Sequence, residues 1–156
     1  MEIIEQNELS NAQKARIIEM WNAEYPASLM HSGISSFDKY LDELGEKKHF
    51  LLFDAAETLA GWAMVFERGG AKWFAIIIDE KAQGKGFGVK MIDALKAGEK
   101  RLFGWVIDND DSRKSNGEIY KSPLGFYRKI GFCVHENEKI EKQGISGIKI
   151  EWNAAG

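Results

Sequence analysis

The stretch Ile76-Ile77-Ile78-Asp79-Glu80-Lys81-Ala82-Gln83-Gly84-Lys85-Gly86-Phe87-Gly88 is an apolar run that leads through a glycine-rich turn into a helical pattern. Phe87, Met91, Ile92 and Leu95 repeat on one face of the predicted helix. Glycines let backbone N–H groups approach a bulky anion, and the first turn of a helix leaves such donors unpaired along a favourable dipole. The stretch therefore predicts a phosphate or pyrophosphate site between a strand and a helix.

A turn that uses glycine only for a tight connection explains the same residues and remains the alternative. The spacing does not match a P-loop, because no Lys-Ser or Lys-Thr pair follows Gly88. It also does not match G-x-G-x-x-G. Both common nucleotide-binding motifs are therefore disfavoured.

The rest of the chain predicts seven strands and four helices in one α/β (α+β) domain over residues 1–156, with a mixed, mainly antiparallel sheet. Strands are expected at residues 3–4, 50–53, 59–66, 73–78, 102–107, 132–135 and 148–152, the three from 50 to 78 forming a meander. Helices are expected at residues 9–25, 35–44, 87–95 and 124–130, the first ended by Pro26 and the second capped at residues 35–38. Residues 108–122 are polar and predict a long loop.

Composition and charge exclude several classes of function. The net charge of −3 lacks the basic bias of a nucleic-acid-binding protein. No apolar run is long enough for a membrane span, and no basic and apolar leader begins the chain, so we expect a cytoplasmic protein. Exposed strand edges leave a homodimer open, and no residue pattern establishes one.

Cysteine and histidine usage predicts neither a disulfide nor a metal site. Cys133 is the single cysteine and lies in an apolar segment, so a buried structural thiol is expected. His31, His49 and His135 are too widely spaced for a recognised metal motif.

Two motifs resemble those of the GNAT (GCN5-related N-acetyltransferase) superfamily. Gln83-x-x-Gly86-x-Gly88 is similar to the family's pyrophosphate signature Q/R-x-x-G-x-G/A, and it lies between a strand and a helix as in the family. Further along, Phe126-Tyr127-Arg128-Lys129-Ile130-Gly131-Phe132 is similar to the family's F-Y-x-K-x-G-F ending. The order of predicted elements matches as well, and the resemblance is strongest over residues 50–135.

This resemblance implies an N-acyltransferase that moves an acetyl group from acetyl-CoA, its co-substrate, to an amine by direct attack. It places the pantetheine arm of acetyl-CoA along the strand 73–78 and the pyrophosphate on the amides of residues 84–89. Tyr127 would be the general acid that protonates the departing thiolate, and an amide near Ile77 or Ile78 would stabilise the oxyanion. The cofactor contacts that it implies are Ile76, Ile78, Gln83, Gly84, Lys85, Gly86, Phe87, Gly88 and Val89.

The general base is less well specified. Family members often carry a glutamate on the central strand, but residues 73–78 contain no carboxylate. Glu67, Asp79, Asp108 and His31 are the alternatives. Asp79 is better explained as a cap or turn residue, so Asp108, directly after a predicted strand, is our candidate base.

The acceptor side carries no motif. The family often has an asparagine about seven residues before the tyrosine, and this chain has Tyr120 there. Trp21, Tyr25 and His31 lie where the family builds part of its acceptor pocket, and core packing explains them equally well. The acceptor amine, from a small molecule or a peptide, is therefore left open. A non-catalytic acyl-CoA binding or sensing domain is the alternative function, which the missing strand glutamate favours.

Overall fold

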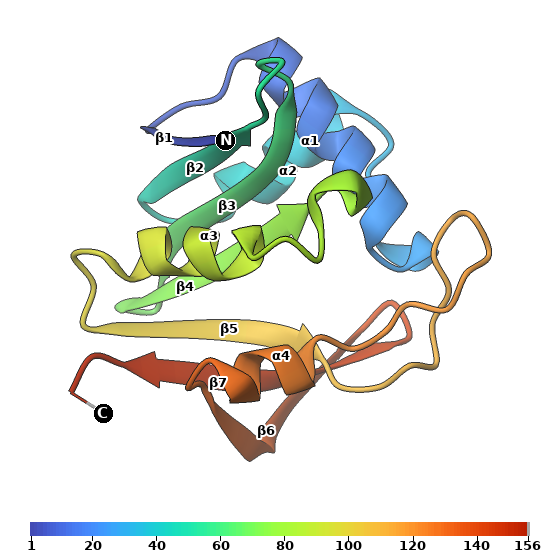
Figure 1. The fold of residues 1–156 in the computed structure, drawn as a ribbon. Coiled ribbons are helices and arrows are strands. Elements are labelled where there is room, and N and C mark those ends of the chain that lie inside the picture. The colour runs from blue at the N-terminus through green and yellow to red at the C-terminus, as the bar shows by residue number, and fades with distance from the viewer. Residues whose placement is uncertain (156) are drawn as a thin grey trace.

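The computed structural model describes residues 1–155 and shows one sheet with helices on both faces (Figure 1). Its strands are β1 (Glu2–Gln6), β2 (Lys47–Phe53), β3 (Leu59–Arg68), β4 (Ala71–Ile78), β5 (Arg101–Ile107), β6 (Cys133–Lys142) and β7 (Ile145–Asn153). Its α-helices are α1 (Asn11–Glu24), α2 (Ile34–Asp42), α3 (Phe87–Lys96) and α4 (Leu124–Lys129), with short 3-10 turns η1 (Ala27–Leu29) and η2 (Glu80–Ala82). The predicted α/β class with seven strands and four helices is confirmed.

The strands follow the order β1-β2-β3-β4-β5-β7-β6. All neighbouring strands are antiparallel except β4 and β5, which are parallel. The meander predicted over residues 50–78 is therefore confirmed as β2, β3 and β4. The parallel pair joins this meander to β5, β7 and β6.

Two hydrophobic cores lie on opposite faces of the sheet. One packs α1 and α2 against buried side chains that include Trp62, Trp73 and Ile77. The other packs α3 and α4 against side chains that include Phe74 and Ile150, and Figure 1 shows these two helices in front of the sheet. Because successive side chains of a strand alternate between faces, β4 contributes to both cores.

Local interactions fix the ends of two helices near the candidate site. α1 begins at a capping box in which Ser10 and Gln13 each bond the other's backbone N–H, and it ends at Glu24, where Tyr25 is the C-cap residue just before Pro26. α3 begins after Gly86, whose φ of 84° lies in the left-handed region that favours glycine. Its buried residues Met91, Ile92 and Leu95 lie on the predicted face.

Three expectations need correction. The second helix is not capped by residues 35–38: it begins at Ile34 after Gly33, and the Ser36 hydroxyl contacts the His31 ring. Cys133 is exposed rather than buried, because β6 is the edge strand of the sheet. β6 also extends to Lys142, well beyond the predicted residue 135, and its outer half is polar and exposed, as is common for edge strands.

No helix among the described residues is long and apolar enough to cross a membrane.

Candidate active site

The two central strands separate shortly after they meet. β4 and β5 share a single register pair, Trp73 with Phe103, whereas β3 pairs with β4 and β5 pairs with β7 along most of their lengths. The second half of β4 therefore has no neighbour on the β5 side. This split leaves backbone groups of β4 free to bind an extended ligand.

The alternation of hydrogen bonds shows which residues of β4 face the split. The N–H of Asp79 donates to Ala60 on β3, so odd-numbered positions at this end face β3 and even-numbered positions face away. The carbonyls of Ile76 and Ile78 accept hydrogen bonds from outside the sheet, at 3.0 Å from the Tyr25 hydroxyl and 2.8 Å from the Gln83 side-chain amide. The N–H groups of Ile76 and Ile78 therefore also point into the split, whereas the N–H of Ile77 points to β3.

The glycine-rich loop lies where β4 leads into α3. Gly84 and Gly86 have φ values of 74° and 84°, which turn the chain sharply before the helix. Within the described part of the chain, the backbone N–H groups of residues 84–89 have no hydrogen-bond acceptor. Lys85 and Val89 are exposed. Gly88 lies close to α4, because a Cβ added to Gly88 would be 3.4 Å from the ring of Phe126. The loop thus offers a row of free donors at a helix N-terminus, the arrangement that binds phosphate groups.

The Gln83 side chain holds the loop to its neighbours. Its amide nitrogen donates to the carbonyl of Ile78 at 2.8 Å and to the carboxylate of Glu24 at 2.9 Å. The Glu24 carboxylate also pairs with Lys114, at 3.6 Å. Gln83 therefore links the end of β4, the end of α1 and the 108–122 loop.

Tyr127 of α4 is buried on the other side of the split. Its ring packs against those of Phe74, Phe126 and Phe132, with centroids 5.2–5.7 Å away. Burial, with a smaller contribution from Tyr120, raises the pKa of Tyr127 above its ordinary value. The hydroxyl therefore stays protonated and is suited to donate a proton or a hydrogen bond.

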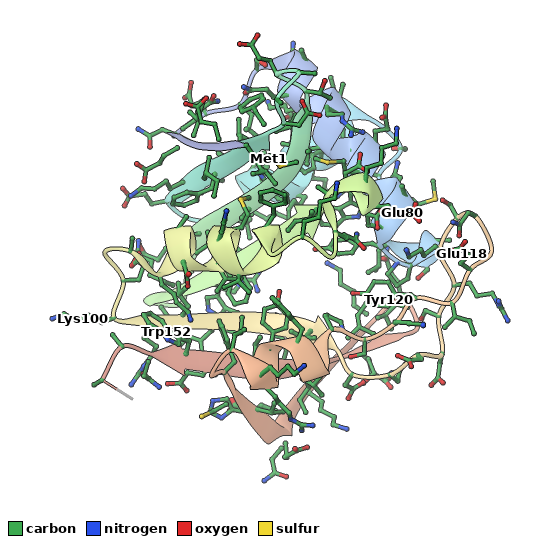
Figure 2. The ribbon with its side chains drawn as sticks, in the orientation of Figure 1. Met1, Glu80, Lys100, Glu118, Tyr120 and Trp152 are labelled. Carbon is green, nitrogen blue, oxygen red and sulfur yellow. The ribbon has the colours of Figure 1, made fainter. Side chains whose placement is uncertain are left out.

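A cavity of about 420 Å³ opens beside the split. Both strands of the split line it through Ile76, Val106 and Ile107. The four tyrosines of the chain, Tyr25, Tyr40, Tyr120 and Tyr127, all line it too, and Figure 2 labels Tyr120 on the loop that leads from β5 to α4. Burial raises the pKa of Tyr40 and of Tyr120 to about 12, so these phenols remain neutral at physiological pH.

None of the predicted base candidates lines this cavity. Asp108 forms an ion pair with Lys139 at 3.3 Å and accepts a hydrogen bond from Asn109. Burial alone would raise the pKa of Asp108, but these two contacts outweigh it and hold the pKa below its ordinary value. A carboxylate stabilised in this way is a poor proton acceptor, so the geometry does not favour Asp108 as the base.

The other candidates have structural partners or lie elsewhere. Asp79 caps η2 and pairs with Arg16, as its position before the turn predicts. Glu67 is exposed at the end of β3. His31 contacts Ser36 at 2.8 Å, and burial lowers its pKa, with a smaller effect from Lys142. Residues 1–155 contain no cluster of three or more side chains suited to bind a metal ion.

Several residues that line the cavity are absent from the sequence-based prediction. Arg68 and Lys142 each end a strand and belong to no motif. In the sequence, the position of Tyr40 is typical of an ordinary core residue of a helix. These three come from β3, β6 and α2, so only the fold brings them together.

The comparison with known families agrees with this geometry. Residues 19–154 match the acetyltransferase (GNAT) domain. The chain belongs to the GNAT acetyltransferase family. A search among curated proteins finds no match.

Solved GNAT structures share the fold at low sequence identity. Aminoglycoside 6'-acetyltransferase type Ii has a TM-score of 0.69 and 15% identity, with 98% of this chain and 97% of that chain covered. A Vibrio cholerae spermidine N-acetyltransferase in complex with CoA and spermine has a TM-score of 0.68 and 14% identity, with 98% and 96% covered. A Sinorhizobium meliloti phosphinothricin acetyltransferase in complex with AcCoA has a TM-score of 0.66 and 13% identity, with 98% and 89% covered.

Proposed function

We propose that this protein is an N-acetyltransferase that moves the acetyl group of acetyl-CoA onto the primary amine of a small acceptor. The proposal rests on three features that lie next to one another: the free amides of residues 84–89, the split between β4 and β5, and the cavity next to Tyr127. The first feature suits a pyrophosphate, the second an extended arm, and the third an acceptor.

Acetyl-CoA would bind with its pyrophosphate on the loop between β4 and α3. Its pantetheine arm would lie along the second half of β4, where the N–H groups of Ile76 and Ile78 face the split. The carbonyls of both residues already accept from Tyr25 and Gln83. We therefore expect the N–H groups, rather than the carbonyls, to be the main backbone contacts of the thioester end.

The reaction would proceed by direct attack. The amine nitrogen forms a bond to the thioester carbon, and the negative charge that develops on the carbonyl oxygen is stabilised by the N–H of Ile78. The carbon–sulfur bond then breaks, and the Tyr127 hydroxyl protonates the departing sulfur. The proton that the amine nitrogen loses returns to Tyr127 through water, which leaves the amide, free CoA thiol and neutral Tyr127.

The cavity offers no group to deprotonate an ammonium. Its described lining contains no carboxylate and no imidazole, and its tyrosines have raised pKa values. An alkyl ammonium with a pKa of about 10 is mostly charged at neutral pH. We therefore propose that the acceptor enters as the minor neutral amine, or loses its proton to water, before attack.

Calorimetric titration with acetyl-CoA, with ATP as the control, tests the cofactor site, and release of free thiol with a panel of amines tests turnover. We expect saturable binding of acetyl-CoA, no binding of ATP, and thiol release that falls by roughly 100-fold or more in Tyr127→Phe with little change in acetyl-CoA affinity. Binding without thiol release for any amine would instead support the sensing function. Absence of acetyl-CoA binding would overturn both.

A further inference from the structure

The charges that line the acceptor cavity all have one sign. Arg68, at the end of β3, and Lys142, at the end of β6, are its charged lining residues, and no aspartate or glutamate lines it among residues 1–155. The remaining walls are mainly aromatic and aliphatic.

Neither cation is neutralised by the protein. Many other basic side chains form ion pairs, for example Lys14 with Asp38 at 2.7 Å and Lys114 with Glu24 at 3.6 Å. Arg68 and Lys142 have no such carboxylate partner in the described part of the chain. Two free cations beside a low-dielectric cavity create a positive potential that attracts anions.

Both side chains line the cavity, although each is also exposed to solvent. Arg68 lies over the rings of Phe66 and Trp73, 5.2 and 5.6 Å from their centroids. Its charge opposes the effect of burial on the pKa of Tyr40, another residue that lines the cavity. The two side chains come from distant strands, so the fold brings them to one cavity.

This arrangement disfavours a polycationic acceptor. An aromatic wall can bind an ammonium through its ring faces, but a guanidinium already lies over Phe66 and Trp73. A second positive charge nearby would be repelled, and no carboxylate in the cavity would compensate.

We infer that the acceptor is a small amine that also carries an oxyanion, such as a carboxylate, on an apolar body. The oxyanion would bind Arg68 and Lys142, since guanidinium and ammonium groups form charge-assisted hydrogen bonds with such groups. The apolar body would pack on the aromatic wall that includes Trp73 and Trp105, whose rings are stacked at 5.4 Å. The amine would then reach the split near Ile76 and Tyr127. This inference rests on the proposed acetyl transfer, and it narrows the acceptor to amino-acid-like molecules.

Binding of matched reaction products tests the charge preference without turnover. N-acetylphenylalanine and N-acetylphenylalaninamide have nearly the same shape and differ in one negative charge. In calorimetry with CoA present, we expect the acid to bind at least about tenfold more tightly than the amide, with a preference that weakens as salt is added. A phosphonate analogue of the acid separates a general oxyanion site from one selective for carboxylate.

Charge reversal locates the site. We expect Arg68→Glu and Lys142→Glu each to lower the affinity for the acid by about tenfold and to change the affinity for the amide by no more than about twofold. Lys100→Glu makes the same charge change on an exposed residue before β5, which Figure 2 shows far from Tyr120, so it should leave both ligands unchanged. Melting temperatures of the variants establish that each remains folded.

Thiol release with phenylalanine, phenylalaninamide and spermidine as acceptors separates this inference from the proposed function. Equal binding of acid and amide, or faster acetylation of spermidine than of phenylalanine at equal neutral-amine concentration, would overturn the anionic acceptor but leave acetyl transfer intact. Selective binding of the acid without thiol release from any acceptor would support the anion site and contradict the transferase.

Discussion

The Tyr25 hydroxyl donates a hydrogen bond to the backbone carbonyl of Ile76 at 3.0 Å. Tyr25 caps the end of α1, and Ile76 lies in the part of β4 that has no neighbour on the β5 side. The bond therefore satisfies a carbonyl that the split would otherwise leave unpaired. It also joins the wall of the acceptor cavity to the strand on which we place the thioester.

Removal of this hydroxyl should destabilise the protein and loosen the split. For Tyr25→Phe we expect the free energy of unfolding to fall by about 1–2 kcal/mol, since a partly buried carbonyl loses its donor. Urea denaturation measures this loss, and a rise in the KM for the acceptor would show that the cavity wall has moved. Tyr40→Phe is the matched control, because the Tyr40 hydroxyl forms no hydrogen bond with residues 1–155. A similar loss in both variants would contradict a specific role for the Tyr25 bond.

A negative charge at the start of α3 should prevent cofactor binding. Gly86→Glu places a carboxylate beside the free amides of residues 84–89, so we expect acetyl-CoA to bind more weakly by at least about tenfold. Gly98→Glu is the control: its φ of 83° and open surroundings match the φ of 84° and open surroundings of Gly86. Both variants should therefore lose similar stability, but in calorimetry only Gly86→Glu should lose affinity for acetyl-CoA. Equal affinity in the two variants would remove the loop from the site.

The sequence predicted the elements on which the cofactor side depends. The run of isoleucines, the glycines and the periodic helix after them are all local, so β4, the loop and α3 were placed correctly. Tyr127 was predicted in a short helix over residues 124–130 for the same reason, and it lies in α4. The class of fold followed from the order of these elements.

The acceptor side could not be predicted in this way. Arg68, Tyr40 and Lys142 come from β3, α2 and β6, which are distant in sequence, and only the fold brings them to one cavity. Asp108 was chosen for its position after a strand, but its contact with Lys139 depends on the course of β6, whose length the sequence did not predict. The exposed position of Cys133 also depends on which strand forms the edge of the sheet.

The pH dependence of turnover should follow the acceptor rather than the protein. Because no carboxylate or imidazole lines the cavity, kcat/KM should rise with pH along one limb whose apparent pKa is that of the acceptor ammonium. Because burial raises the pKa of Tyr127, the acid stays protonated, and the rate should not fall again up to about pH 9. Acceptors that differ in ammonium pKa test this in one series. A rising limb at the same pH for every acceptor would reveal a protein base outside the cavity.

Gly104 of β5 lies directly against the Phe74 ring. A Cβ at this position would come within 2.7 Å of a ring carbon of Phe74, which is 7% exposed and packs against Tyr127 and Phe132. The ring cannot move away freely, so we expect Gly104→Ala to lower the free energy of unfolding by about 1–3 kcal/mol, as overpacked cores do. Displacement of Phe74 should also shift Tyr127 and so lower kcat more than it changes acetyl-CoA affinity.

Gly33→Ala provides the comparison for this change. A Cβ on Gly33 has open space around it, and the extended backbone there suits alanine. Urea denaturation should therefore show a lower free energy of unfolding for Gly104→Ala. For Gly33→Ala, the free energy of unfolding should change by no more than about 0.5 kcal/mol. If Gly104→Ala keeps wild-type stability and kcat, the contact between Gly104 and Phe74 does not position Tyr127, and the α4 helix alone must hold the acid in place.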